Sequence, residues 1–118
     1  MVVEDNDAVR KSMARLLGML GYQVGVACDG SEALELIERG GEVDLVLTDV
    51  AMPRLSGPEL AQRLCQDRPE LPILFMSGNV NAAQLEAQLG WKRVSFLPKP
   101  ANLRQLADAT RQTLDRAS

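Results

Sequence analysis

Short apolar runs alternate with helical apolar stripes along the whole chain. The runs stop after a few residues at polar or breaker positions, so they are typical of buried strands rather than helices. Strand–helix alternation of this kind favours a parallel sheet with helices on both faces. The chain is therefore expected to fold as a doubly wound α/β domain. Its five predicted strands are residues 2–3, 22–27, 43–48, 72–76 and 94–97.

Capping residues and glycines mark the ends of the predicted helices. Gly21 closes the first apolar stripe and Gly40-Gly41 closes the second, as expected where the backbone turns left-handed. Residues 56–59 have the pattern of a capping box, in which Ser56 and Glu59 satisfy each other's backbone amides. The five predicted helices begin after Asn6-Asp7, at Ser31, at Ser56, at Asn79 and after Asn102.

Charged residues follow three of the predicted strands. Glu4 and Asp5 follow the first strand, Asp49 follows the third, and Lys99 follows the fifth. In an open α/β sheet the ligand site lies outside the carboxyl ends of the strands, where the strand order reverses. For the order 2-1-3-4-5 that point lies between strands one and three, so Glu4, Asp5 and Asp49 are expected to converge. Ser77 and Lys99 are expected beside them, at the ends of strands four and five.

Three converging carboxylates repel one another unless a cation neutralises them. Mg²⁺ suits such a site, because it binds a few oxygen ligands, keeps several waters and completes its shell with a substrate phosphate. With the ion screening its charge, Asp49 is expected to attack a phosphoryl donor, and Lys99 to balance charge on the transferred oxygens. The predicted product is an aspartyl phosphate.

Length, charge and composition exclude several other classes of protein. A chain of 118 residues has the length of a single domain. Its net charge of −3 argues against direct binding to nucleic acid. No apolar stretch approaches the roughly 18 to 20 residues that span a bilayer, so we expect a cytoplasmic protein without membrane contact. The chain has no histidine, and Cys28 and Cys65 lack the spacing of metal ligands, so neither a metal site nor a disulfide is expected from them.

These motifs, in this order, resemble the receiver (response-regulator) domains of two-component phosphorelays. Residues 2–5 look like the acid-pair strand, and Asp49 with Met52-Pro53 and Gly57 looks like the phosphoacceptor loop. Residues 76–78 look like the switch-hydroxyl turn, and residues 96–100 like the closing Lys-Pro motif. The resemblance covers essentially the whole chain and implies the flavodoxin-like (βα)5 fold.

The resemblance also implies a set of ligands for the metal ion. Glu4 and Asp5 would hold Mg²⁺, with Asp5 the more direct ligand, and the backbone carbonyl of Ala51 would add a further oxygen. Asp49 would be both a ligand and the phosphoacceptor. Phosphatases of the haloacid-dehalogenase type use a similar aspartate, but they need a second acid at the position that Ala51 occupies here, so that class is disfavoured.

Three further residues would respond to the phosphoryl group if the resemblance holds. Ser77 would hydrogen-bond the group, Lys99 would pair with Asp49 and then with the phosphate, and Phe96 would occupy the aromatic switch position. Simple core packing is an equal interpretation of Phe96, whose neighbours are apolar. A docking module of the same fold that is never phosphorylated is the alternative for the whole domain.

The resemblance also implies the partners. The donor would be a phosphohistidine on a histidine kinase or a phosphotransfer protein, because this chain has no histidine of its own. Phosphorylation would then switch partner binding, and a phosphorylation-dependent dimer fits the same scheme. We expect residues 1–118 to be one receiver domain within a longer protein, since only three residues precede the acid pair where a strand needs about five. A hybrid sensor histidine kinase is the favoured parent.

Overall fold

The computed structural model describes residues 1–40, 42–50, 55–68, 70–77, 94–98 and 102–117. The described strands are β1 (Val2–Val3), β2 (Val26–Ala27), β3 (Val46–Asp49), β4 (Ile73–Ser77) and β5 (Val94–Pro98). The described helices are α1 (Asp7–Met19), α2 (Gly30–Glu38), α3 (Gly57–Asp67) and α5 (Leu103–Ala117). The helix predicted over residues 79–89 lies outside the described residues.

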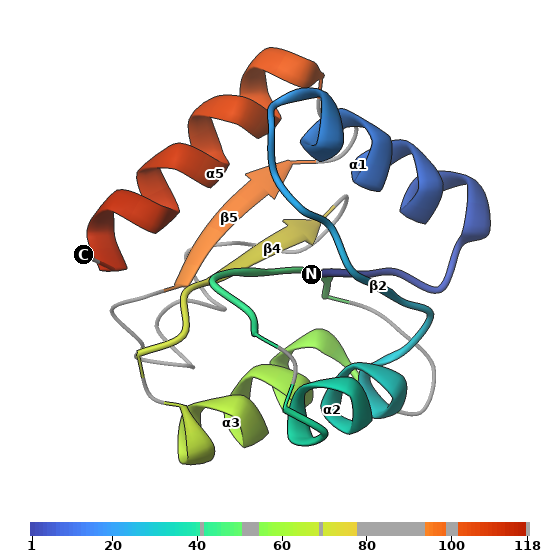
Figure 1. Cartoon of the computed structure of the whole chain (residues 1–118), viewed down its shortest axis with the longest axis vertical. Coiled ribbons are helices and arrows are strands. Elements are labelled where there is room, and N and C mark those ends of the chain that lie inside the picture. The colour runs from blue at the N-terminus through green and yellow to red at the C-terminus, as the bar shows by residue number, and fades with distance from the viewer. Residues whose placement is uncertain (41, 51–54, 69, 78–93, 99–101, 118) are drawn as a thin grey trace.

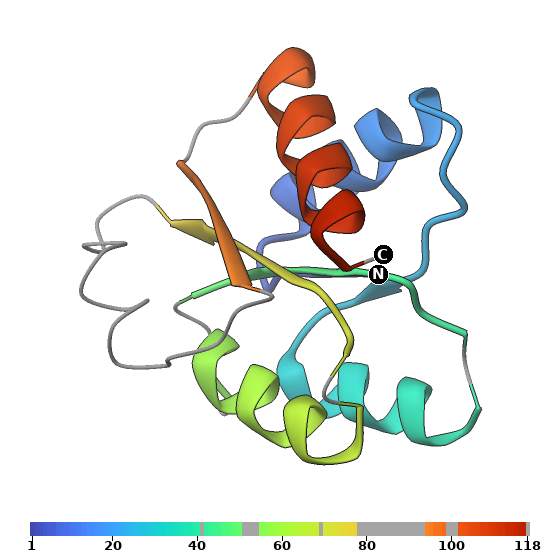
Figure 2. The same cartoon turned by 90° about the vertical axis from the view of Figure 1, so that its left-hand side faces the viewer.

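The strands form one parallel sheet in the order β2-β1-β3-β4-β5. This is the order that the sequence predicted. Helices α1 and α5 cover one face of the sheet, and α2 and α3 cover the other (Figures 1 and 2). Val3 of β1 pairs with Thr48 of β3, so the residue that follows each of them lies at the same carboxyl edge. The register therefore brings Glu4 next to Asp49.

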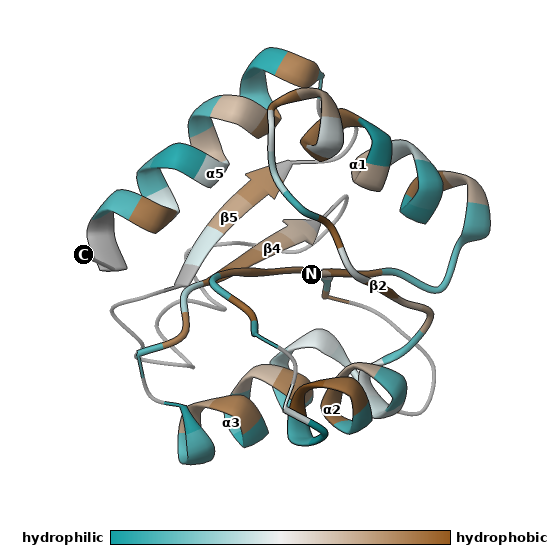
Figure 3. Ribbon diagram, viewed as in Figure 1, coloured by the Kyte–Doolittle hydropathy of each residue, from teal (hydrophilic) through white to brown (hydrophobic). Residues whose placement is uncertain are grey.

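The core consists of two apolar layers, one on each face of the sheet. Alternate strand residues point to opposite faces. Val3 and Phe75 belong to the layer under α2 and α3, whereas Val2 and Leu74 belong to the layer under α1 and α5. Figure 3 shows the strands as mainly hydrophobic and the helices as polar along much of their surface. A sheet buried on both faces explains why the strands are continuous apolar runs in the sequence.

The predicted caps of α3 and α5 are confirmed. Ser56 accepts a hydrogen bond from the Glu59 amide at 3.3 Å, and the Glu59 carboxylate accepts one from the Ser56 amide at 3.4 Å. Asn102 and Gln105 form the same reciprocal pair at the start of α5, with bonds of 2.8 and 3.0 Å. Both helices thus begin where their sequence signals indicated.

The predicted cap of α2 is wrong. The helix begins at Gly30, and Asp29 rather than Ser31 is its N-cap, accepting a hydrogen bond from the Glu32 amide at 2.8 Å. Asp and Ser cap equally well, and the carboxylate also interacts favourably with the positive end of the helix dipole. Asp29 lies two residues nearer to β2, so the helix starts as soon as the chain leaves the strand.

The predicted ends of α1 and α2 are confirmed, because glycines with left-handed backbone follow both helices. Gly21 and Gly40 each have φ of 95°, a conformation that is strained for residues with a Cβ atom. The Gly21 amide donates to the carbonyl of Gly18 at 3.0 Å, and the Gly40 amide donates to that of Ile37 at 3.1 Å. Each glycine therefore satisfies a helix-terminal carbonyl while it reverses the chain. Gly41 lies outside the described residues.

Four strands differ in extent from the prediction. β4 covers residues 73–77 instead of 72–76, and β5 covers 94–98 instead of 94–97. β2 covers only residues 26–27 of the predicted 22–27, and β3 covers 46–49 instead of 43–48. β2 is an edge strand, and its only neighbour β1 offers two residues for pairing. β3 reaches Asp49 because β4 continues alongside it, with Asp49 paired to Met76. Apolar patterning cannot reveal how far the neighbouring strand extends.

The hydroxyl of Thr110 is buried in α5 without a hydrogen-bond partner in the described part of the chain. Burying an unpaired hydroxyl costs about 1 to 3 kcal/mol. We therefore expect Thr110→Val to raise the free energy of unfolding by about 1 kcal/mol, measured by urea denaturation. Thr113→Val is the matched control, because the Thr113 hydroxyl donates to the Ala109 carbonyl at 2.6 Å. An equal effect of both substitutions would contradict the explanation.

None of the helices within the described ranges combines the length and the apolar character that a membrane span requires.

Candidate functional site

Three carboxylates meet at the carboxyl edge of the sheet. Glu4 and Asp5 follow β1 directly, and Asp49 is the last residue of β3. One carboxylate oxygen from each residue can be chosen so that all three lie within 4.8 Å of one another. β1 and β3 are adjacent strands from which the chain continues to helices on opposite faces, so this is the point where the strand order reverses. The structure thus brings together the three acids that the sequence placed at strand ends.

The three acids differ in burial and in how they are held. Glu4 is only 1% exposed, its amide donates to the Ala27 carbonyl at 3.1 Å, and its carboxylate accepts a hydrogen bond from the Asn6 amide at 3.2 Å. Asp49 is half-buried and Asp5 is exposed. The cluster therefore has a fixed inner acid and an open outer side, from which a cation or a phosphoryl group can enter.

Backbone hydrogen bonds fix the chain around Asp49. The Thr48 hydroxyl donates to the Asp49 carbonyl at 3.1 Å, and the Val50 amide donates to the Met76 carbonyl at 3.2 Å. The Gly57 amide donates back to the Val50 carbonyl at 3.0 Å, which ties the start of α3 to the end of β3. This contact of Thr48 was not predicted from the sequence, although a polar residue within an apolar run was the available signal.

Gly57 also lies in close contact with Asp49. A Cβ atom built on Gly57 would lie 2.2 Å from the Asp49 carbonyl oxygen. Cβ atoms essentially never approach another heavy atom so closely, so only glycine fits at this position. The first residue of α3 therefore packs directly on the backbone of Asp49.

Other predicted site residues lie partly or wholly outside the described part of the chain. Ser77 is the last residue of β4, at the same edge of the sheet, but its side chain is not described. β5 ends at Pro98, and Lys99 and Ala51 lie outside the described residues. Their predicted roles remain predictions.

Phe96 packs on the ring of Phe75. The ring centroids are 5.6 Å apart with an interplanar angle of 26°, and Phe96 is half-buried against the layer under α2 and α3. The side chain thus has an apolar partner in this structure, as the core-packing interpretation requires. A stacked aromatic pair contributes about 0.5 to 1.5 kcal/mol beyond burial, so an outward rotation of Phe96 carries a moderate cost.

The chemistry of the acid cluster fits Mg²⁺. Its three described donors are all carboxylate oxygens, the hard ligands that Mg²⁺ prefers, and the chain has no histidine to favour a softer metal. The exposed side at Asp5 leaves room for the waters that Mg²⁺ retains. A divalent cation would also neutralise the mutual repulsion of the three acids.

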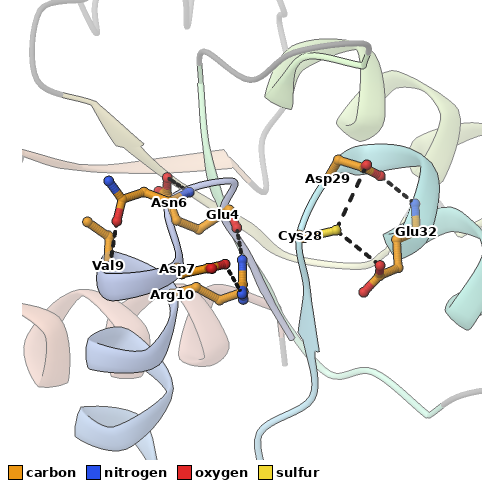
Figure 4. Close-up of polar contacts among 8 residues, drawn as sticks. All are labelled: Glu4, Asn6, Asp7, Val9, Arg10, Cys28, Asp29 and Glu32. Atoms are coloured by element: carbon orange, nitrogen blue, oxygen red, sulfur yellow. Dashed lines mark hydrogen bonds and ion pairs between the residues drawn. The ribbon is translucent and has the colours of Figure 1, made fainter.

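Cys28 and Asp29 follow β2 at the same edge of the sheet, as Figure 4 shows. The Cys28 thiol donates to the Glu32 carboxylate at 3.1 Å. This hydrogen bond, with the added effects of desolvation and of the charges of Glu32 and Asp29, raises the pKa of the Cys28 thiol above its ordinary value. The thiol therefore stays protonated at neutral pH and is a poor nucleophile. Cys28 and Cys65 are both free in this structure.

A hollow of about 880 Å³ lies at the other end of the sheet. Its lining includes Gly25 and Leu45, which immediately precede β2 and β3, together with Leu17 and Leu114 from α1 and α5. It is therefore at the amino ends of the strands, whereas ligands of open α/β sheets bind at the carboxyl ends. Despite its size, it does not displace the acid cluster as the candidate functional site.

Fold and site together define a doubly wound α/β domain with an acidic, cation-compatible cluster at its switch point. The sequence matches the response regulator receiver domain family over residues 1–111. The chain belongs to this family, which confirms the resemblance and makes it a receiver domain of two-component signalling.

Two curated relatives illustrate the proteins in which similar domains occur. The chain is 41% identical over 117 residues to the sensor kinase CckA of Brucella abortus (strain 2308), covering 98% of this chain and 12% of that protein. It is 40% identical over 118 residues to the response regulator MprA of Mycobacterium sp. (strain KMS), covering 100% of this chain and 51% of that protein. The chain thus spans about half of the length of MprA and about an eighth of that of CckA, and these relatives differ in kind.

Solved structures confirm the fold. A crystal structure of the receiver domain from the hybrid histidine kinase CckA has a TM-score of 0.77 and 39% identity, covering 96% of this chain and 95% of that one. A response regulator receiver protein from Sinorhizobium medicae WSM419 has a TM-score of 0.88 and 25% identity, covering 99% and 94%. The predicted flavodoxin-like architecture is therefore correct.

Proposed function

We propose that this domain accepts a phosphoryl group on Asp49 from a phosphohistidine of a partner histidine kinase or phosphotransfer protein, in the presence of Mg²⁺. The observation that carries the proposal is the convergence of the Glu4, Asp5 and Asp49 carboxylates within 4.8 Å at the switch point of the sheet. A docking module that needs no phosphorylation would have no use for three mutually repelling acids at one edge.

Glu4, Asp5 and Asp49 would hold the ion, and we expect the backbone carbonyl of Ala51 to join them. Bound Mg²⁺ supplies charge screening and oxygen coordination for a phosphoryl group. A carboxylate oxygen of Asp49 forms the new bond to phosphorus while the N–P bond of the donor breaks. The electron pair of that bond returns to the imidazole of the partner. Half-burial of Asp49 leaves one side of the carboxylate open for this attack.

Lys99, Ser77 and Phe96 have proposed roles after the transfer. Lys99 follows β5 and would neutralise charge on the phosphoryl oxygens, and Ser77 at the end of β4 would hydrogen-bond them. Movement of Ser77 and Phe96 toward the phosphorylated site would shift the conformational population of the β4–β5–α5 region and so switch partner binding or dimerisation. The stacking of Phe96 on Phe75 is the contact that this movement would rearrange.

The likeness to the CckA receiver supports a hybrid sensor kinase as the parent protein, with phosphotransfer in the cytoplasm. The likeness to MprA supports a response regulator as the alternative parent. Both parents use the same acceptor chemistry, so the proposal for Asp49 does not depend on the choice.

Phosphorylation by a small-molecule donor tests the proposal. Acetyl phosphate is mixed with the native chain with and without Mg²⁺, and intact-mass spectrometry records the gain of one phosphoryl group. We expect the gain to require Mg²⁺ and to be absent in Asp49→Asn. Asp44→Asn is the matched control, because Asp44 is an exposed acid just before the same strand. Phosphorylation of Asp49→Asn, or none of the native chain, would reject the proposal and favour the docking module.

A further inference from the structure

Arg10 of α1 reaches back to the residues that carry the acid pair. Its guanidinium donates to the backbone carbonyl of Glu4 at 3.0 Å through Nη1, and its Nη2 contacts the carboxylate of Asp7 (Figure 4). The Arg10 side chain is only 15% exposed, whereas that of Asp7 is 75% exposed. The contact with Glu4 is thus the more buried of the two and the less weakened by water.

The contact between Arg10 and Glu4 acts on the peptide unit that leads to Asp5. The Glu4 carbonyl belongs to the same planar peptide unit as the amide nitrogen and Cα of Asp5. Fixing that carbonyl therefore fixes the plane from which the Asp5 side chain departs. On the other side of Glu4, its amide donates to Ala27, so the residue is already held by β2. Arg10 supplies the restraint at the end where Asp5 begins.

Asn6 completes the arrangement. Its amide donates to the Glu4 carboxylate at 3.2 Å, and its side-chain oxygen caps α1 by accepting from the Val9 amide at 3.1 Å. The first turn of α1 therefore holds the side chain of Glu4 through Asn6 and the backbone of Glu4 through Arg10.

We propose that Arg10 is a positioning residue for the divalent-cation site, which orients Asp5 through the Glu4 carbonyl. The inference rests on the proposed function, because it assigns the cluster of Glu4, Asp5 and Asp49 to a cation. Residues that orient metal ligands without contacting the metal commonly change its affinity by 10-fold to 100-fold.

The direction in which the Mg²⁺ affinity changes when Arg10 is replaced distinguishes positioning from simple electrostatics. Arg10 is a cation near a cation site, so charge alone predicts that its removal strengthens Mg²⁺ binding. Positioning predicts the opposite, because a released Glu4–Asp5 peptide has to be ordered again by the ion. A purely structural role predicts lower stability with unchanged affinity of the folded protein.

Mg²⁺ titration calorimetry on the native chain and on Arg10→Met provides the test. We expect Mg²⁺ to bind Arg10→Met about tenfold more weakly. Lys11→Met removes an exposed charge from the neighbouring position and should stay within about twofold of the native affinity. Asp7→Asn removes only the exposed partner of Arg10, so its Mg²⁺ affinity should also stay close to that of the native chain. Equal or tighter binding by Arg10→Met would overturn the inference.

A second measurement reports the geometry without any metal. The backbone amide of Asp5 lies in the peptide unit that Arg10 holds, so its ¹H–¹⁵N NMR resonance should shift in metal-free Arg10→Met but not in Lys11→Met. Arg10→Lys keeps the charge but shortens the side chain, so its ammonium ends one bond short of the Nη1 position that contacts the Glu4 carbonyl. This variant serves if Arg10→Met fails to fold. Mg²⁺ binding to Arg10→Lys with native affinity would count against positioning.

The outcomes also distinguish this inference from the proposed function. Absence of Mg²⁺ binding to the native chain would reject both. Native Mg²⁺ binding that weakens in Asp49→Asn but not in Arg10→Met would leave the proposed function in place and reject the role of Arg10.

Discussion

Gly57→Ala is expected to destabilise the domain by about 3 kcal/mol, the upper range for overpacking a close-packed site. The added Cβ atom would lie 2.2 Å from the Asp49 carbonyl oxygen and 3.1 Å from Cε1 of Phe75. Neither neighbour is free to retreat, because Asp49 is paired with Met76 of β4 and Phe75 is completely buried. The start of α3 has to move away from the sheet instead, and its bond from Gly57 to Val50 is lost.

Urea denaturation followed by circular dichroism measures this loss, with Gly18→Ala as the matched control. A Cβ atom on Gly18 would meet nothing within 4 Å, and the residue lies inside α1 with ordinary helical backbone. Alanine there should raise the free energy of unfolding by about 0.5 to 1 kcal/mol. A loss smaller than 1 kcal/mol for Gly57→Ala would show that α3 adjusts easily to the extra atom.

The same substitution links the fold to the function. The atom that collides is the carbonyl oxygen of Asp49, the proposed phosphoacceptor. Moving the start of α3 away from that carbonyl also removes the contact that packs behind Asp49. We therefore attribute the glycine at the start of α3 to close packing against Asp49 rather than to flexibility.

The fold was predictable because its signals are local. Each strand of a sheet buried on both faces is an apolar run, and each helix shows apolar spacing with a cap, as Ser56 and Asn102 illustrate. The acid cluster was predictable for a related reason. Once strand order is assumed, residues at the carboxyl ends of adjacent strands must be neighbours, and Glu4 and Asp49 follow paired residues of β1 and β3.

Features that depend on contacts between distant segments were not predictable. The limits of β2 follow from the two residues that β1 offers, and the choice of Asp29 over Ser31 as a cap depends on where the chain leaves that strand. The contacts of Arg10 with Glu4, and of Gly57 with Asp49, require the three-dimensional path of each loop. An arginine or a glycine near an acid is too common in sequences to indicate such a contact by itself.

Asp5→Asn is expected to make the metal-free domain more stable and to remove its response to Mg²⁺. The carboxylates of Glu4, Asp5 and Asp49 lie within 4.8 Å of one another, so without a cation each pair repels by about 1 kcal/mol even with water-like screening. Asp5 is exposed, and asparagine has the same shape, so the substitution disturbs no packing. We expect the free energy of unfolding in EDTA to rise by about 1 kcal/mol.

The native chain should behave in the opposite way when Mg²⁺ is added. A ligand at 100 times its dissociation constant stabilises the folded state by about 2.7 kcal/mol, and we expect this gain to depend on an oxygen from Asp5. Asp108→Asn, which removes an exposed acid from α5, should keep the native Mg²⁺ response and leave metal-free stability nearly unchanged. Thermal unfolding of all three proteins with EDTA and with Mg²⁺ checks both effects. If Asp5→Asn were less stable than the native chain in EDTA, or kept its full Mg²⁺ response, the three acids would not form a site held in readiness for a cation. The expected result would mean that the carboxylate of Asp5 lowers the stability of the metal-free domain and is needed for binding the ion.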